Sequence, residues 1–180
     1  MIAARYMLLA VMAATAVSGQ DSLNNRLILA AGQGNLATVR SLIAQGAEVN
    51  AQSADGNTAL IKAVHTRRTD VIHLLMSKGA DVNRKTNNGF TALLAAAYMN
   101  QQSVVDMLLA ANADVNAQTI DTGMTPLMFA AHAGNAGIVK SLLAHHADVG
   151  LKNKEGKTAL ALAEEARATD AVKLLGSHNP

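Results

Sequence analysis

The ten residues Leu74-Leu75-Met76-Ser77-Lys78-Gly79-Ala80-Asp81-Val82-Asn83 end in a phrase that recurs along the chain. The phrase is an Ala, an acidic residue, a Val and, in most copies, an Asn. Counterparts of residues 79–83 stand at 46–50 and 112–116, each 33 residues away, and a fourth copy stands at 146–150. A fixed period of this length indicates a repeat protein, in which each unit buries its apolar face against its neighbours.

A second phrase follows the same period. Thr-Ala-Leu or Thr-Pro-Leu begins at Thr58, Thr91, Thr125 and Thr158, in steps of 33, 34 and 33 residues. With both phrases on one period, the chain resembles the ankyrin repeat family from about Ser22 to its C-terminus. The resemblance implies an all-α solenoid of about five helix-turn-helix repeats with short β-turn loops. We expect one ankyrin repeat domain over 20–180, with repeats at about 22–53, 54–86, 87–119, 120–153 and 154–180.

The repeat at 120–153 shows the expected unit most completely. Gly123 suits the tip of a turn because it accepts backbone conformations that other residues avoid. Thr125 is placed to cap the first helix, and Pro126 suits its first position, which needs no amide donor. Gly134 then ends that helix before a second one begins.

Two departures from the family pattern bear on stability. The histidine of the usual Thr-Pro-Leu-His phrase is replaced by Ile61, Leu94, Met128 and Ala161. In the family these histidines connect neighbouring turns by hydrogen bonds, so this array is expected to depend more on apolar packing. The glycine that usually ends the first helix is replaced by Arg67, Asn100 and Arg167, of which Arg adopts the left-handed conformation least readily.

The first 19 residues do not fit the repeat. Arg5 precedes an uncharged run at 6–17, and small residues follow, which is typical of a secretory signal peptide. The run is shorter than the roughly 20 apolar residues of a membrane span. Cleavage after Ser18, Gly19 or Ala16 fits the small-residue rule. The alternatives are a hydrophobic helix that caps the first repeat of an intracellular scaffold, and an uncleaved anchor.

A signal peptide at 1–19 predicts an exported protein, periplasmic or secreted if the leader is of the bacterial kind, whereas the capping helix predicts a cytoplasmic one. No second apolar run of this kind follows. We therefore expect no stable membrane insertion after removal of the leader. We also expect the protein to be a monomer.

The composition argues against catalysis and against nucleic-acid binding. The chain has no cysteine, a net charge of +2 and no basic run. Motifs of hydrolases, metalloproteases and nucleotide-binding proteins are absent from the sequence. We expect no enzyme activity, cofactor or metal. A metal-binding protein is the remote alternative, since His65 and His132 fall on one face of nearby repeats. The Asp residues of the recurring phrase are expected to close loops.

In ankyrin repeat proteins, the turn tips and first helices form a concave face that holds protein partners. We expect a protein partner here, bound at the matching positions, which are Asn57, His65, Thr66, Phe90, Tyr98, Met99, Met124 and His132. Phe90 and Tyr98 fall in one repeat and predict an apolar hot spot with a polar rim. The alternative is that both rings cover the seam between repeats. Phe129 stands where the family usually has Leu, so it is expected to be packed in.

Overall fold

The computed structural model describes residues 19–178, and the regular structure of this part of the chain is helical. Four seven-residue helices are the first helices of their repeats, and we call them the inner helices: α3 (Ala59–His65), α5 (Ala92–Tyr98), α7 (Pro126–His132) and α9 (Ala159–Glu165). The second helices are longer: α2 (Leu36–Ala44), α4 (Thr69–Ser77), α6 (Gln102–Ala110), α8 (Ala136–Ala144) and α10 (Thr169–Gly176). Residues 19–33 are also helical.

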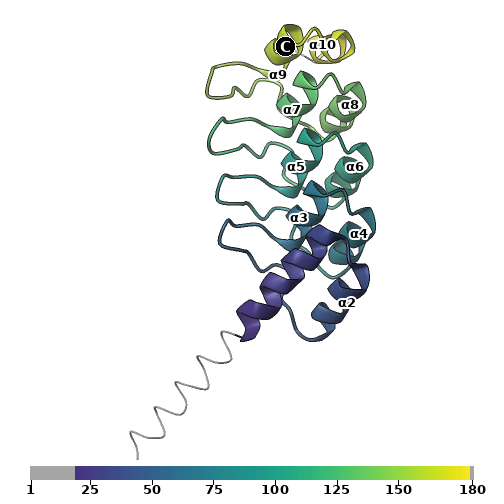
Figure 1. Ribbon diagram of the computed structural model, residues 1–180. Coiled ribbons are helices and arrows are strands. Elements are labelled where there is room, and N and C mark those ends of the chain that lie inside the picture. Colours follow the sequence, from purple (N-terminus) through teal and green to yellow (C-terminus); the bar gives the residue numbers. More distant parts are fainter. Residues whose placement is uncertain (1–18, 179–180) are drawn as a thin grey trace, which may run out of the picture.

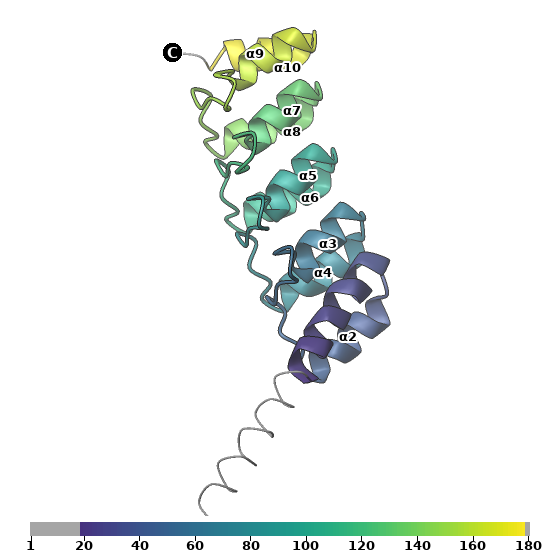
Figure 2. The ribbon, with the colours of Figure 1, turned by 60° about the vertical axis from the view of Figure 1, so that its left-hand side comes forward.

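The helices stand in two columns, and the turns project from the column of inner helices (Figure 1). Each inner helix packs against the second helix of its own repeat and against the inner helices of the neighbouring repeats. Figure 2 shows the turns following one side of the stack along its whole length. The predicted all-α repeat solenoid is therefore confirmed.

The regular spacing of the threonines sets the start of all four inner helices. Thr58, Thr91, Thr125 and Thr158 each accept a hydrogen bond from the amide three residues later, at 3.1 to 3.3 Å. Pro126 occupies the first position of α7, as expected. In two second helices, α2 and α8, Asn35 and Asn135 fill the capping position in the same way.

The core is continuous along the stack and consists mainly of alanine, leucine, isoleucine and valine. Ile61, Leu94 and Met128, which replace the family's histidines, are at most 1% exposed. Within the described residues, every buried side-chain nitrogen or oxygen has a hydrogen-bond partner. The expected dependence on apolar packing at these three positions is thus what the structure shows.

The residues that replace glycine at the end of the inner helices adopt the left-handed conformation. Arg67, Asn100 and Arg167 have φ angles of 57°, 57° and 56°. For L-residues this conformation costs roughly 1–2 kcal/mol. Arg67 recovers part of that cost, because its guanidinium donates a hydrogen bond of 2.6 Å to the Met99 carbonyl of the next repeat.

Neighbouring turns are joined by backbone hydrogen bonds. Asn87 N donates to Asp55 O at 3.1 Å, Ile120 N to Asn88 O at 2.9 Å, and Lys154 N to Thr122 O at 2.9 Å. These bonds hold the four turns at 53–57, 86–90, 119–124 and 153–157 in fixed register. We call these turns and the exposed side of the inner helices the inner face.

The recurring phrase at the other end of each repeat also joins neighbours. Asn50 Oδ1 accepts a hydrogen bond from Asp81 N at 2.8 Å, and Asn83 Oδ1 accepts one from Asp114 N at 2.8 Å. The Asp81 carboxylate accepts from the Asn83 amide of its own loop at 2.9 Å. The acidic residue closes the loop, as expected, and the Asn connects the repeats.

The first repeat opens on a helix that is longer than the inner helices. A helix at 19–33 starts before Ser22, the expected first residue of the repeat. Its early residues are anchored, because Gln20 Nε2 donates to Gly46 O at 2.9 Å and Asn24 Oδ1 accepts from Glu48 N at 2.9 Å. Asn24 thus holds the first loop as Asn50 holds the next. The predicted signal peptide lies at 1–19, outside the described residues except for Gly19.

Candidate protein-binding face

Three aromatic rings meet on the inner face. The Phe129 ring centroid lies 6.0 Å from that of Phe90 in a stacked arrangement, and 5.3 Å from that of Tyr98 in an edge-to-face arrangement. Both distances are in the range where aromatic pairs attract. Phe90 and Phe129 are half-buried, whereas Tyr98 is 59% exposed. We call these three residues the aromatic cluster.

The sequence explains why Phe129 can reach back to the preceding repeat. Phe90 lies in the turn before α5, Tyr98 is the last residue of α5, and Phe129 belongs to α7. The residue of α5 that corresponds to Phe129 is Ala95, which is fully buried. The repeat of Phe90 and Tyr98 thus has a methyl group at this position, and the ring that joins its two aromatic residues comes from the next repeat.

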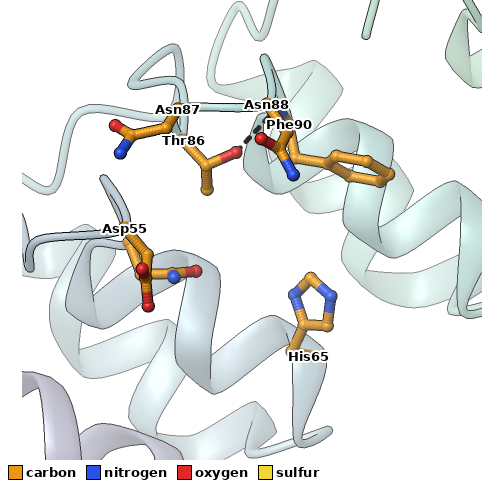
Figure 3. Close-up of a pocket in the computed structure, with 7 residues that line it drawn as sticks. Asp55, His65, Thr86, Asn87, Asn88 and Phe90 are labelled. Atoms are coloured by element: carbon orange, nitrogen blue, oxygen red, sulfur yellow. Dashed lines mark hydrogen bonds between the residues drawn. The ribbon is translucent and has the colours of Figure 1, made fainter. Parts of the chain in front are cut away.

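A groove of about 410 Å³ lies beside the cluster, between the turns at 53–57 and 86–90. We call it the first groove. Its lining residues are Asp55, Asn57, His65, Thr86, Asn87, Asn88 and Phe90. Figure 3 shows Asp55 and His65 on one side and Thr86, Asn87, Asn88 and Phe90 on the other. The Thr86 hydroxyl accepts a hydrogen bond from the Phe90 amide at 3.0 Å and so fixes the turn that carries the ring.

A second groove, of about 510 Å³, lies on the other side of the cluster between the turns at 119–124 and 153–157. Met124, His132, Asn153, Lys157 and Glu165 are among its lining residues. Lys157 Nζ lies 2.9 Å from Glu165 and 3.2 Å from Glu155. This side of the inner face is therefore occupied by ion pairs of the protein itself.

The ion pairs of the second groove also set the charge state of its lysine. Hydrogen bonds that Lys157 Nζ donates to the Glu165 and Glu155 carboxylates raise the pKa of Lys157. A pKa raised by folding adds stability below the ordinary lysine pKa, and this contribution is lost as the pH rises through the raised value. Lys157 thus remains charged and paired at neutral pH.

The eight predicted site residues fall into separate groups. Phe90 and Tyr98 meet through Phe129, Asn57 and His65 line the first groove with Phe90, and Met124 and His132 line the second. Thr66 and Met99 follow α3 and α5 directly, at the helix ends. His65 and His132 thus line different grooves, and in the described part of the chain no three His, Asp or Glu side chains come together as a metal site.

Sequence reasoning missed three contributors to this face. Phe129 packs against the core, as expected, but it is only half-buried and also joins the two predicted rings, which was not expected. Asp55 and Asn88 were absent from the predicted site because residues at turn tips suit the turn itself. The 33-residue spacing places Asp55 and Asn88 at matching positions of adjacent turns. This correspondence could have predicted that both residues line the same face.

Comparison with known families gives the class of protein. A family model described as ankyrin repeats in three copies matches residues 27–119, and one described as ankyrin repeats in many copies matches residues 119–163. The chain belongs to the ankyrin repeat family. Ankyrin repeats are generally non-catalytic modules of protein–protein interaction. No individual curated protein matches the chain. None of the helices in the described residues is long and apolar enough to span a membrane.

Proposed function

We propose that this chain binds a protein partner on its inner face, without catalysis, and that the aromatic cluster is the anchor of the interface. The observation that carries the proposal is Tyr98, which stays 59% exposed although its ring packs edge-to-face on Phe129. Aromatic residues that are held rigidly and partly exposed are enriched among the hot spots of interfaces. Polar grooves flank the cluster on both sides, which suits the rim of an interface.

The alternative role of the rings is to cover the seam between the third and fourth repeats. Phe90 and Phe129 contribute to that cover, since both are half-buried and stacked. Tyr98 is different, because most of its surface faces solvent although its ring packs on Phe129. Phe90 and Phe129 therefore suit the covering of the seam, and Tyr98 suits the anchoring of a partner.

The test is a partner capture from host extract with wild-type protein and the Phe90→Ala, Tyr98→Ala double variant. We expect the double variant to lose a host protein that the wild type retains, with affinity reduced by roughly 2 kcal/mol or more, or about 30-fold. Binding curves with the identified partner give the affinity. Circular dichroism checks that the helical content is unchanged.

Leu29→Ala is the matched control, because Leu29 is a large apolar side chain of the first repeat and is 61% exposed. It should retain the partner as the wild type does. Equal retention by the double variant and the wild type would contradict the proposal and would assign both rings to the seam. Equal loss in Leu29→Ala would show that capture depends on exposed apolar surface in general.

We also propose that the protein is exported, to the periplasm or out of the cell. The support is the charge and hydropathy pattern of residues 1–19, which is typical of a signal peptide. The expected result is an intact mass, for protein purified from its native host, that corresponds to a start at Val17, Gly19 or Gln20. A mass that includes Met1 would contradict cleavage and would favour the intracellular scaffold with a capping helix.

A further inference from the structure

The first groove contains polar side chains that the protein does not use for its own hydrogen bonds. Within the described residues, the side chains of Asp55, Asn57, His65 and Asn88 have no hydrogen-bond or ion-pair partner, although all four line one groove. The second groove differs. There Lys157 is held by two glutamates, and Asn153 Oδ1 accepts from the amides of Glu155 and Lys157. In the described part of the chain, the second groove also has side chains without such a partner, Asp121 and His132, but lysines line it, whereas no lysine or arginine lines the first groove.

The negative charge of the first groove favours a positively charged ligand. Of the described residues that line it, Asp55 alone carries a formal charge when histidine is neutral. The amide oxygens of Asn57 and Asn88 add neutral acceptors. Phe90 also lines the groove, and the face of an aromatic ring attracts cations. A carboxylate, amide oxygens and an aromatic face together suit a cation that donates several hydrogen bonds.

We propose that the first groove binds the guanidinium group of an arginine side chain of the protein partner. The guanidinium is planar, always charged and carries five N–H donors, so it can pair with a carboxylate, reach further acceptors and lie against an aromatic ring at the same time. The ammonium group of lysine is a compact point charge with three donors and makes less use of this arrangement. This proposal rests on the proposed function, because it assigns the chemistry of the partner at that same face.

Phe90 connects the two parts of the face, since it lines the first groove and also stacks on Phe129 in the aromatic cluster. A partner segment that places arginine in the groove therefore brings a neighbouring residue to Phe129 and Tyr98. The chemistry of the face fits a partner segment in which an arginine stands next to a large apolar residue.

The proposal can be tested before the partner is known. ¹⁵N-labelled full-length protein is titrated with N-acetylarginine amide, with the neutral isostere N-acetylcitrulline amide, and with the corresponding lysine amide. We expect the arginine compound to shift the side-chain amide signals of Asn57 and Asn88. The lysine compound should bind more weakly, and the citrulline compound should leave these signals unchanged.

Two exposed carboxylates provide matched variants. Asp55→Asn keeps the shape of the side chain and removes the charge of the first groove, so the response to arginine should be lost. Asp121→Asn removes a carboxylate of the second groove and should respond as the wild type does. Equal responses to arginine and citrulline, an unchanged response in Asp55→Asn, or no shift up to the solubility of the probe would overturn the proposal.

Because the titration uses no partner, its result is independent of the capture experiment. A partner captured through the aromatic cluster together with a silent titration would leave the proposed function in place and remove the arginine site. A positive titration without capture would keep the groove as a guanidinium site and remove the proposed function of the cluster.

Discussion

Replacing Leu94 with alanine is expected to lower the free energy of unfolding by about 3 kcal/mol, since Leu→Ala substitutions at buried sites cost roughly 2–5 kcal/mol. Leu94 is fully buried in α5, at the position where the family usually has histidine. The neighbouring repeats place Ile61 and Met128 at the same position, both at most 1% exposed. The cost combines the lost transfer of the side chain out of water with the cavity that it leaves behind.

Urea denaturation followed by circular dichroism measures this change, with the free energy obtained from the linear dependence on urea. Leu94→Met is the matched control. It keeps the volume and introduces the residue that the next repeat carries naturally, so its cost should stay below about 1.5 kcal/mol. A Leu94→Ala protein as stable as Leu94→Met would show that packing at this position does not support the stack.

The fold could be predicted because its determinants are local and repeated. From the second repeat onward a threonine caps the first helix of each repeat, and the spacing of these threonines fixes where the four inner helices begin. The first repeat lacks this threonine. Its helix at 19–33 is anchored by Gln20 and Asn24, which contact residues 26 and 24 positions further along the chain. These contacts belong to neither of the two repeated phrases, so the repeat pattern does not predict them.

The candidate site was harder to predict because it depends on contacts between repeats. The matching positions identified Phe90 and Tyr98, but the ring that joins them, Phe129, comes from the next repeat. A pattern within one repeat does not contain that contact. The polar side chains of the first groove are a similar case, since they come from two adjacent repeats. Whether they have hydrogen-bond partners depends on how the two repeats pack.

The turn that borders the first groove is held close to its neighbour, and Gly56 allows this approach. Gly56 has a φ angle of 76°, and a Cβ atom there would lie 2.7 Å from Asn87 N and 2.9 Å from Thr86 Cα. Asn87 N is the atom that donates to Asp55 O at 3.1 Å. A methyl group at Gly56 would therefore push against the backbone hydrogen bond that keeps the two sides of the groove in register.

We expect Gly56→Ala to destabilise the protein by about 3 kcal/mol. Roughly 1–2 kcal/mol comes from the left-handed conformation of a residue with a Cβ atom. Overpacking against backbone that has no room to move adds about 1–3 kcal/mol. Urea denaturation gives the total, and amide exchange at Asn87 reports whether the bond to Asp55 has opened.

Gly156→Ala separates the two contributions. Gly156 stands at the same position of the last turn with a φ angle of 78°, but a Cβ atom there would meet no described residue within 4 Å other than its two chain neighbours. Gly156→Ala should lower the free energy of unfolding only by the cost of the left-handed conformation, about 1–2 kcal/mol. If both variants lose equal stability, the close approach of the turns adds nothing. If Gly56→Ala loses more and also loses its response to N-acetylarginine amide, the register of the turns is what shapes the first groove.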